Sequence, residues 1–115
     1  MNIEEMLQSY LVCALWSSTG DDDEPLDSTH GVNDIAPESV ESARIACMWF
    51  VDRMLPWLGD WDAGQAGHDL WLTRNGHGTG FWDRGREHGK RLSDFAHSMG
   101  KSDAYIGDDG KVYLG

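Results

Sequence analysis

The chain has 115 residues, of which 40% are hydrophobic and 25% are charged. This length predicts one domain spanning residues 1–115, with a modest core to which many of the six tryptophans contribute. The sequence lacks an apolar run of about 20 residues that would cross a membrane, and the N-terminus opens on acids, unlike a signal peptide. We therefore expect no membrane partner.

Negative charge is concentrated in the first third of the chain. Residues 1–43 contain ten acids and no lysine or arginine, a net charge of -10, whereas residues 44–115 contain ten acids and nine bases, a net charge of -1. Such an acidic region repels nucleic acids and membrane surfaces and attracts basic partners. Direct binding of nucleic acid is therefore not expected, although several arginines lie in residues 74–91.

The first half of the chain predicts two helices separated by an acidic loop. Residues 3–17 show helical apolar spacing, with Asn2 as a capping residue. Residues 18–35 carry four consecutive charges and predict a flexible loop. A second helix should begin near Pro37, because proline suits a first turn, and its apolar residues recur at helical spacing through Leu58. Pro56 should kink or end this helix, and residues 59–67 should form a loop.

The second half predicts two hairpins and a third helix. Residues 67–85 centre on Asn75-Gly76, a pair typical of two-residue hairpin turns. Residues 86–99 predict an amphipathic helix, and residues 104–114 a second hairpin around an Asp-Asp-Gly turn. The expected fold class is α+β, with about three helices packed on a small antiparallel sheet made of the two hairpins.

The segment 67–85 has a distinctive sequence, GHDLWLTRNGHGTGFWDRG. It resembles a motif of a family of small, mostly uncharacterised bacteriophage and prophage proteins, which runs close to GHDFWLTRNGHGAGFWDRG. Leu70 and Thr79 replace the usual phenylalanine and alanine. The resemblance covers about the last half of the chain and implies a phage origin, and hence the host cytoplasm as location. It implies no established activity.

Two interpretations of this signature segment stay open. In the architectural interpretation, its aromatic residues fill the core and its polar residues pair with one another or cap the next helix. The residues that we assign to the signature are His68, Asp69, Trp71, Arg74, Asn75, Gly76, Phe81, Trp82, Asp83 and Arg84. In the chemical interpretation, a small metal-dependent or hydrolytic enzyme uses the region of His68, Asp69, His77 and Asp83.

The chemical interpretation is the weaker of the two. The histidine spacing matches no standard zinc arrangement, and neither cysteine lies near the segment. Cys13 and Cys47 fall in apolar stretches of the two expected helices and are predicted to be buried, reduced thiols. Thr73 and Thr79 are unpersuasive nucleophiles. We therefore predict no metal, no cofactor and no catalytic residues.

The acidic surface is then the candidate site of function. The hypothesis is a phage-encoded protein that imitates the charge of DNA and inhibits a host nucleic-acid-handling protein with a basic surface, such as a CRISPR effector or a restriction enzyme. A virion or assembly component without inhibitory role is the alternative, and self-association into a homodimer stays open. The predicted partner-binding residues are Asp21, Asp22, Asp23, Glu24, Asp27, Glu38 and Glu41, with Trp57 and Trp61 as candidate aromatic anchors.

Overall fold

The computed structural model describes residues 1–20, 23–77, 80–85 and 87–115. In these residues the chain forms four α-helices, three short 3-10 helices and one two-stranded antiparallel sheet. In chain order these are α1 (Ile3–Ser17), η1 (Leu26–Ser28), η2 (Val32–Asp34), α2 (Pro37–Leu58), α3 (Ala63–Arg74), η3 (Phe81–Asp83), α4 (Gly89–Ser98), β1 (Ala104–Ile106) and β2 (Val112–Leu114). The fold is therefore α+β in the broad sense, with one more helix and one fewer hairpin than predicted.

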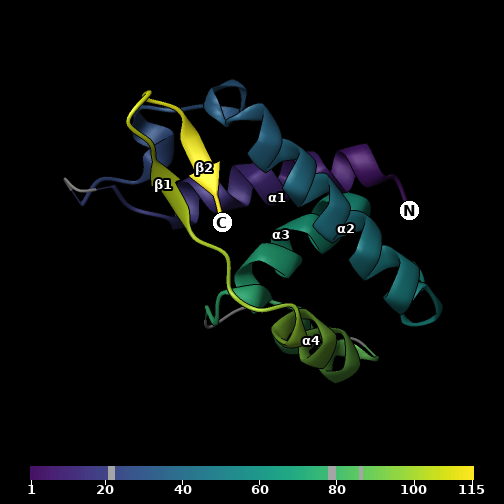
Figure 1. The fold of residues 1–115 in the computed structure, drawn as a ribbon. Helices are drawn as coiled ribbons and strands as arrows, with labels where there is room; N and C mark the ends of the chain where they lie inside the picture. The colour runs from purple at the N-terminus through teal and green to yellow at the C-terminus, as the bar shows by residue number, and fades with distance from the viewer. Residues whose placement is uncertain (21–22, 78–79, 86) are drawn as a thin grey trace.

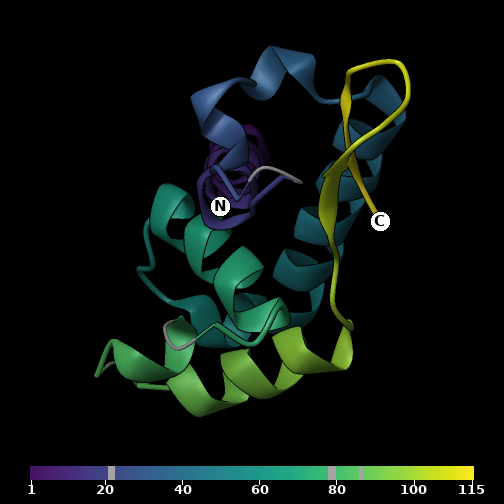
Figure 2. The same ribbon diagram turned by 90° about the vertical axis from the view of Figure 1, so that its left-hand side faces the viewer.

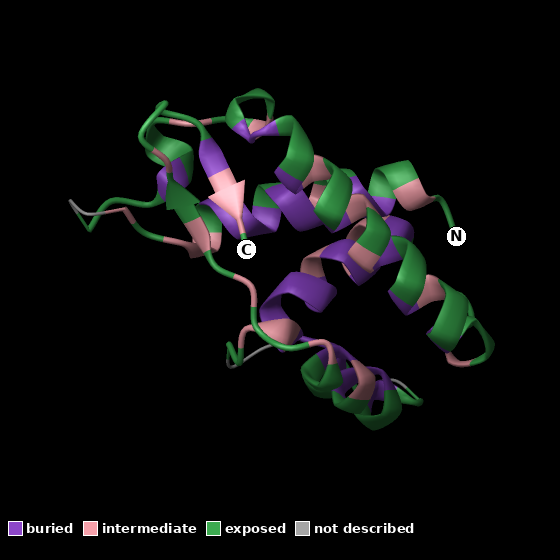
Figure 3. Cartoon of the chain, in the orientation of Figure 1, coloured by how far each residue is buried: buried purple, intermediate pink, exposed green. Residues whose placement is uncertain are grey.

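The helices form one cluster and the hairpin lies at one end of it (Figure 1). α1 packs mainly against α3, α4 packs on α2 and α3, and β2 packs on α2. The buried surfaces of the helices face one another in the interior (Figure 3). The molecule is elongated, with dimensions of 41 × 25 × 21 Å, and so has two distinct ends along its long axis.

The first two helices agree with the sequence prediction. Asn2 caps α1 by accepting a hydrogen bond of 3.1 Å from the backbone of Glu5. α2 begins at Pro37 and buries most of its expected apolar face, including the fully buried Cys47 and Phe50. Pro56 lies within the last turn of α2, which ends two residues later at Leu58.

The signature hairpin was predicted wrongly, because residues 63–74 form helix α3. Asp62 caps its start by accepting a hydrogen bond of 3.0 Å from the backbone of Gln65. Asn75 and Gly76, which we interpreted as a hairpin turn, end the helix instead. Gly76 has a φ of 71°, and His77 N–H donates to the carbonyl of Leu72 at 3.1 Å, as in a common helix stop. Asparagine and glycine tolerate positive φ in both settings, so this pair alone does not distinguish them.

A glycine in α3 sets the distance between α3 and α1. A Cβ added at Gly67 would lie 2.0 Å from the backbone oxygen of Met6. Any side chain at this position would force the two helices apart. The glycine that opens the signature segment is therefore required by helix packing.

The remaining elements follow the prediction with shifted bounds. α4 begins at Gly89, while Arg86, at its predicted start, lies outside the described residues, as do Gly78 and Thr79 of the signature. The second hairpin is confirmed: β1 and β2 pair with Tyr105 opposite Tyr113. These two strands form the whole of the sheet in the described part of the chain, instead of joining a sheet with residues 67–85.

The acidic loop after α1 contains more regular structure than its charge predicted. Thr19 and Pro25 form an isolated antiparallel bridge, and η1 and η2 follow. Leu26, only 1% exposed, inserts into the core beneath the loop. The loop lies at the same end of the molecule as the β1–β2 hairpin, as Figure 2 shows.

Candidate functional site

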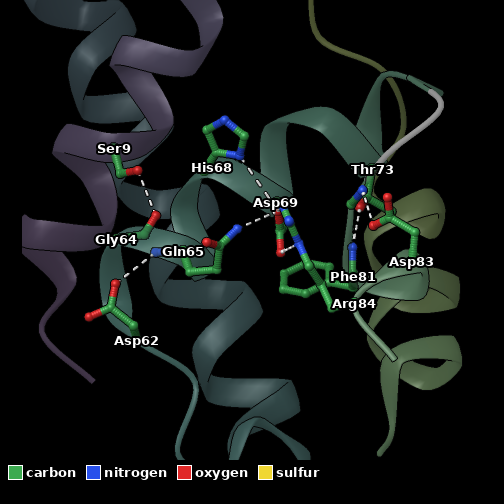
Figure 4. A network of polar contacts seen from close by, with 11 residues as sticks. Ser9, Asp62, Gly64, Gln65, His68, Asp69, Thr73, Phe81, Asp83 and Arg84 are labelled. Carbon is green, nitrogen blue, oxygen red and sulfur yellow. Dashed lines mark hydrogen bonds and ion pairs between the residues drawn. The ribbon is translucent and has the colours of Figure 1, made fainter. Parts of the chain in front are cut away.

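The signature segment surrounds a buried carboxylate. Asp69 in α3 is fully buried and accepts hydrogen bonds from Arg84 Nε at 3.1 Å and Arg84 Nη2 at 2.6 Å (Figure 4). Gln65 Nε2 donates a third hydrogen bond at 2.9 Å. The hydrogen bond to Asp69 is the main cause that raises the pKa of Arg84. The bidentate hydrogen bonding of Arg84 to Asp69 holds the segment after η3 against α3.

His68 lies beside this carboxylate without completing a catalytic arrangement. Its Nδ1 is 3.5 Å from Asp69 Oδ1 and has no hydrogen-bond partner among the described residues. Its ring stacks on Trp16 of α1, with 5.7 Å between the ring centroids. The carboxylate of Asp69 is already bound by Arg84 and Gln65, so it is not a dedicated partner of the histidine.

The last residues of the signature form a tight turn that packs on the core. Phe81 is fully buried and stacks on Phe50, with 5.2 Å between their ring centroids. Its backbone N–H donates to Thr73 Oγ1 at 3.2 Å, and the N–H of Gly80 donates to Asp83 at 2.9 Å (Figure 4). Gly80 has a φ of 145°, and a Cβ there would lie 2.1 Å from Thr73 Oγ1. These polar groups therefore satisfy the backbone of a tight turn, while Trp82 beside them is 56% exposed.

The central residues of the signature join α3 to distant parts of the chain. Trp71 Nε1 donates to Ser17 Oγ at 2.8 Å. Arg74 donates to the hydroxyl of Tyr10 at 3.0 Å and to the carbonyl of Gly100 at 2.8 Å. The side chain of Asn75 accepts a hydrogen bond of 2.8 Å from the backbone of Ser102. Each of these contacts joins α3 to another part of the fold.

The residues of the chemical interpretation lie in different settings. His77 is exposed beyond the end of α3, and Asp83 is bonded to the backbone of its own turn. Among the described residues, no three histidine, cysteine or acidic side chains are placed to hold a metal ion. Burial raises the pKa of Cys13 and of Cys47 to about 12, so neither thiol is an activated nucleophile. Thr79 lies outside the described residues.

The acidic loop meets a second acidic turn at one end of the molecule. His30 Nε2 lies 3.0 Å from the carbonyl oxygen of Gly110, in the turn of the β1–β2 hairpin. η2 leads into an isolated bridge between Ile35 and Val112 of β2. These contacts bring two groups of carboxylates together from distant parts of the sequence. We call this surface the acidic end, and its described carboxylates are Asp23, Glu24, Asp27, Asp108 and Asp109, all on exposed residues.

The acidic end also carries exposed aromatic and apolar side chains. Tyr105 is 52% exposed and Ile106 is 43% exposed. The ring of Tyr105 stacks on Tyr113 with 5.9 Å between centroids. Tyr113 donates a hydrogen bond of 2.7 Å to Asp109, which raises the pKa of Tyr113 to about 12 and lowers that of Asp109. Protein-binding surfaces commonly place aromatic residues at the centre and polar residues at the rim.

The predicted partner-binding residues do not all lie together. Glu38 is near the acidic end, at the start of α2, but Trp57 is 19 residues further along the same helix, a distance of about 28 Å. Trp57 is partly buried under the guanidinium of Arg91, 4.4 Å from its ring centroid. Trp61 is 5% exposed and packs against Phe81 in the core. The two tryptophans therefore do not serve as anchors for the acidic loop.

Three further predicted residues have different positions. Glu41 forms an ion pair with Arg44, which also pairs with Glu4 at 3.1 Å, so part of the N-terminal negative charge is neutralised within the protein. Asp21 and Asp22 lie outside the described residues. Tyr105 and Ile106 were not predicted as surface residues of the site, although the acidic turn that follows them was a usable signal.

No described helix is both long enough and apolar enough to cross a membrane. No protein-family model, curated protein or solved structure matches the chain.

Proposed function

We propose that this protein binds and inhibits a nucleic-acid-handling protein by placing its acidic end on the basic surface where the nucleic acid would bind. The observation that carries this proposal is the contact between His30 and Gly110, which unites the acidic loop with the acidic turn of the hairpin. A surface with several neighbouring carboxylates imitates the spaced negative charges of a nucleic acid backbone.

The composition of the acidic end fits this role physically. Carboxylates at the rim of an interface mainly raise the association rate and select a basic partner. Affinity requires an apolar or aromatic centre, which Tyr105 and Ile106 supply beside the carboxylates. The resemblance of residues 67–85 to phage proteins favours a host protein as the target, for example a CRISPR effector or a restriction enzyme, and thus the host cytoplasm.

A capture experiment with two charge-matched variants tests the proposal. The tagged protein is incubated with a bacterial lysate, with and without excess duplex DNA, and the retained proteins are identified by mass spectrometry. The first variant carries D23N, E24Q and D27N at the acidic end; asparagine suits position 23, where φ is 63°. The control variant carries D52N, E87Q and D94N, three exposed acids outside the acidic end, and has the same net charge.

The two variants should behave differently. The native protein and the control variant should retain basic nucleic-acid-binding proteins that excess DNA releases, and the acidic-end variant should retain at least tenfold less of them. Purified targets should lose DNA binding or cleavage when the native protein is added. Equal capture by both variants, or capture that DNA does not affect, would show that the acidic end does not act as a mimic of nucleic acid.

A further inference from the structure

Two cavities lie in a row along the outer edge of β1. The cavity beside the hairpin turn has a volume of about 410 Å³ and lies between Ile106 and Pro25. The neighbouring cavity has a volume of about 350 Å³ and lies between Ala104 and Thr19. Both cavities lie between the stretch 101–107 and the segment that follows α1, and the end of α3 lines the second one as well. We call the two cavities together the groove; Figure 2 shows β1 and the segment after α1 at the same end of the molecule.

One wall of this groove presents unpaired backbone groups of β1. Asp103 and Gly115 exchange two backbone hydrogen bonds of 3.1 and 2.9 Å. Facing residues in an antiparallel pair of strands alternate between hydrogen-bonded and non-hydrogen-bonded pairs. Because Asp103 and Gly115 form a hydrogen-bonded pair, the N–H and C=O groups of Ala104 and Ile106 point away from β2. No described residue hydrogen-bonds with them. An edge of this kind is a template for another extended chain.

Thr19, on the other side of the second cavity, also has backbone groups without a partner among the described residues. The bridge between Thr19 and Pro25 is flanked by two backbone hydrogen bonds, of 3.0 and 2.9 Å, formed by the residues on either side. In this pattern the N–H and C=O of Thr19 point away from Pro25. No described residue hydrogen-bonds with them either. Thr19 and Ala104 line the same cavity, so an extended chain between the walls would be near backbone donors and acceptors of both.

The charges around the groove determine what kind of chain would enter it. The charged residues that line the two cavities are Glu24, Lys101 and Asp103. In the described residues of 18–29 and 101–111 around them, the basic residues are Lys101 and Lys111. Carboxylates are more numerous, and those described in the same segments are Asp23, Glu24, Asp27, Asp103, Asp108 and Asp109. A second copy of this chain would bring the same carboxylates to the contact, and like charges facing each other oppose association. A basic segment of another protein is complementary.

We propose that the groove along β1 binds an extended basic segment of the partner protein by strand addition. This inference rests on the proposed function of the acidic end and identifies the part of the partner that it recognises. The groove runs from Lys101 to Gly107, so it accommodates about six or seven extended residues at roughly 3.3 Å each. Backbone hydrogen bonds to Ala104 and Ile106 hold the segment, and alternate lysine or arginine side chains face the carboxylates.

Synthetic peptides separate strand addition from simple charge attraction. The probe is an acetylated and amidated peptide of sequence Lys-Val-Lys-Val-Lys-Val-Lys. Two further peptides have the same sequence and charge but carry N-methyl groups on the valines or on the internal lysines, which removes backbone donors on one edge or the other. Binding is measured by calorimetry, and exchange protection of the Ala104, Ile106 and Thr19 amides is measured by NMR. We expect the parent peptide to protect these amides, and at least one methylated peptide to bind at least tenfold more weakly.

Variants of the protein provide an independent readout. I106P removes the outward N–H of β1, whereas I106A keeps it and loses only the side chain. We expect I106P to bind the parent peptide at least tenfold more weakly than I106A, because both variants lack the isoleucine side chain and only I106P also lacks the backbone N–H. The NMR spectrum of I106P would reveal whether the substitution disrupts the hairpin. If it does, the methylated peptides still show whether the peptide binds by strand addition.

The outcomes distinguish this inference from the proposed function. Equal binding of all three peptides, with no protection of the β1 amides, would overturn strand addition even if DNA-sensitive capture by the acidic end were observed. Conversely, the peptide could bind in a way that depends on its backbone donors while no target is captured in a DNA-sensitive way. That result would support strand addition in the groove and contradict nucleic acid mimicry. Protection of Ala104 and Ile106 in a dimer that forms without peptide would identify a second copy as the occupant and overturn the inference.

Discussion

Arg84 donates two hydrogen bonds to the carboxylate of Asp69, a residue 15 positions earlier and fully buried in α3. The guanidinium is about one-third exposed, so the pair lies at the border between the core and solvent. This contact turns the chain after η3 back onto α3. It explains why an acidic residue occupies a position in the middle of an otherwise apolar helix face.

Loss of this pair should destabilise the fold. R84A leaves the buried Asp69 carboxylate with Gln65 as its remaining side-chain hydrogen-bond donor, and we expect the free energy of unfolding to fall by about 3 kcal/mol in urea denaturation at neutral pH. K90A is the matched control, because Lys90 forms an exposed ion pair with Asp94 at 2.8 Å and should contribute less than about 0.5 kcal/mol. Similar losses in both variants would mean that the buried pair is not a main contact of the signature.

The close approach of α1 and α3 should make Gly67 intolerant of substitution. In G67A the new methyl group would overlap the backbone of Met6, so we expect a loss of about 3 kcal/mol or more in thermal or chemical unfolding. G64A in the same helix is the control, because its Cβ would meet only the side chain of Asp62, at 3.1 Å. A stable G67A protein would contradict the observed separation of α1 and α3.

The hydrogen bond between Tyr113 and Asp109 should produce an alkaline pH dependence. The pKa of Tyr113 is raised from 10.0 to about 12, so the folded state keeps the phenolic proton that the unfolded state loses. This stabilisation is fully present below pH 10 and is lost as pH rises through about 12. The pKa of Asp109 is lowered from 3.8, so its contribution is present above that pH and is lost in more acidic solution.

Absorbance titration of the tyrosines checks this prediction. D109N should return the titration of Tyr113 toward the ordinary value. Y113F should reduce the high-pH component by one tyrosine and leave that of Tyr10, whose pKa is raised by burial. An unchanged high-pH component in D109N would show that this hydrogen bond is not its cause.

The anchoring of the acidic loop should affect binding without a change of charge. L26A removes a side chain that is 1% exposed, and we expect a loss of about 3 kcal/mol in unfolding free energy. Under conditions in which the variant remains folded, its affinity for the target should fall severalfold because the carboxylates of the loop lose their fixed position. L55A, at an exposed site on α2, should change stability by less than about 0.5 kcal/mol and leave binding intact.

Local sequence patterns predicted most elements. The apolar spacing of residues 3–17 and 37–58 identified α1 and α2, and strand-forming residues on both sides of an Asp-Asp-Gly turn identified the C-terminal hairpin. The failure at α3 has a local cause, because Asn75-Gly76 suits a hairpin turn and a helix stop equally. The glycines of residues 76–80 favoured the hairpin interpretation, whereas the capping residue Asp62 was the signal for a helix.

The candidate site depended on contacts that no local pattern contains. The charge of the N-terminal third pointed to the acidic loop, but the bond between His30 and Gly110 joins residues 80 positions apart. The pairing of Asp69 with Arg84 and the burial of Trp61 are likewise results of tertiary packing. Sequence analysis therefore identified the acidic character of the site but assigned it the wrong aromatic neighbours.

The two buried cysteines can report local unfolding of the protein. Both thiols are 0% exposed, and burial raises their pKa to about 12, so a thiol reagent at neutral pH reacts with them only when the chain opens. Cys13 lies in α1 and Cys47 in α2, so the labelling rate of each one measures how often its own helix is exposed. A cysteine introduced on the surface would carry a fluorophore selectively in the native state.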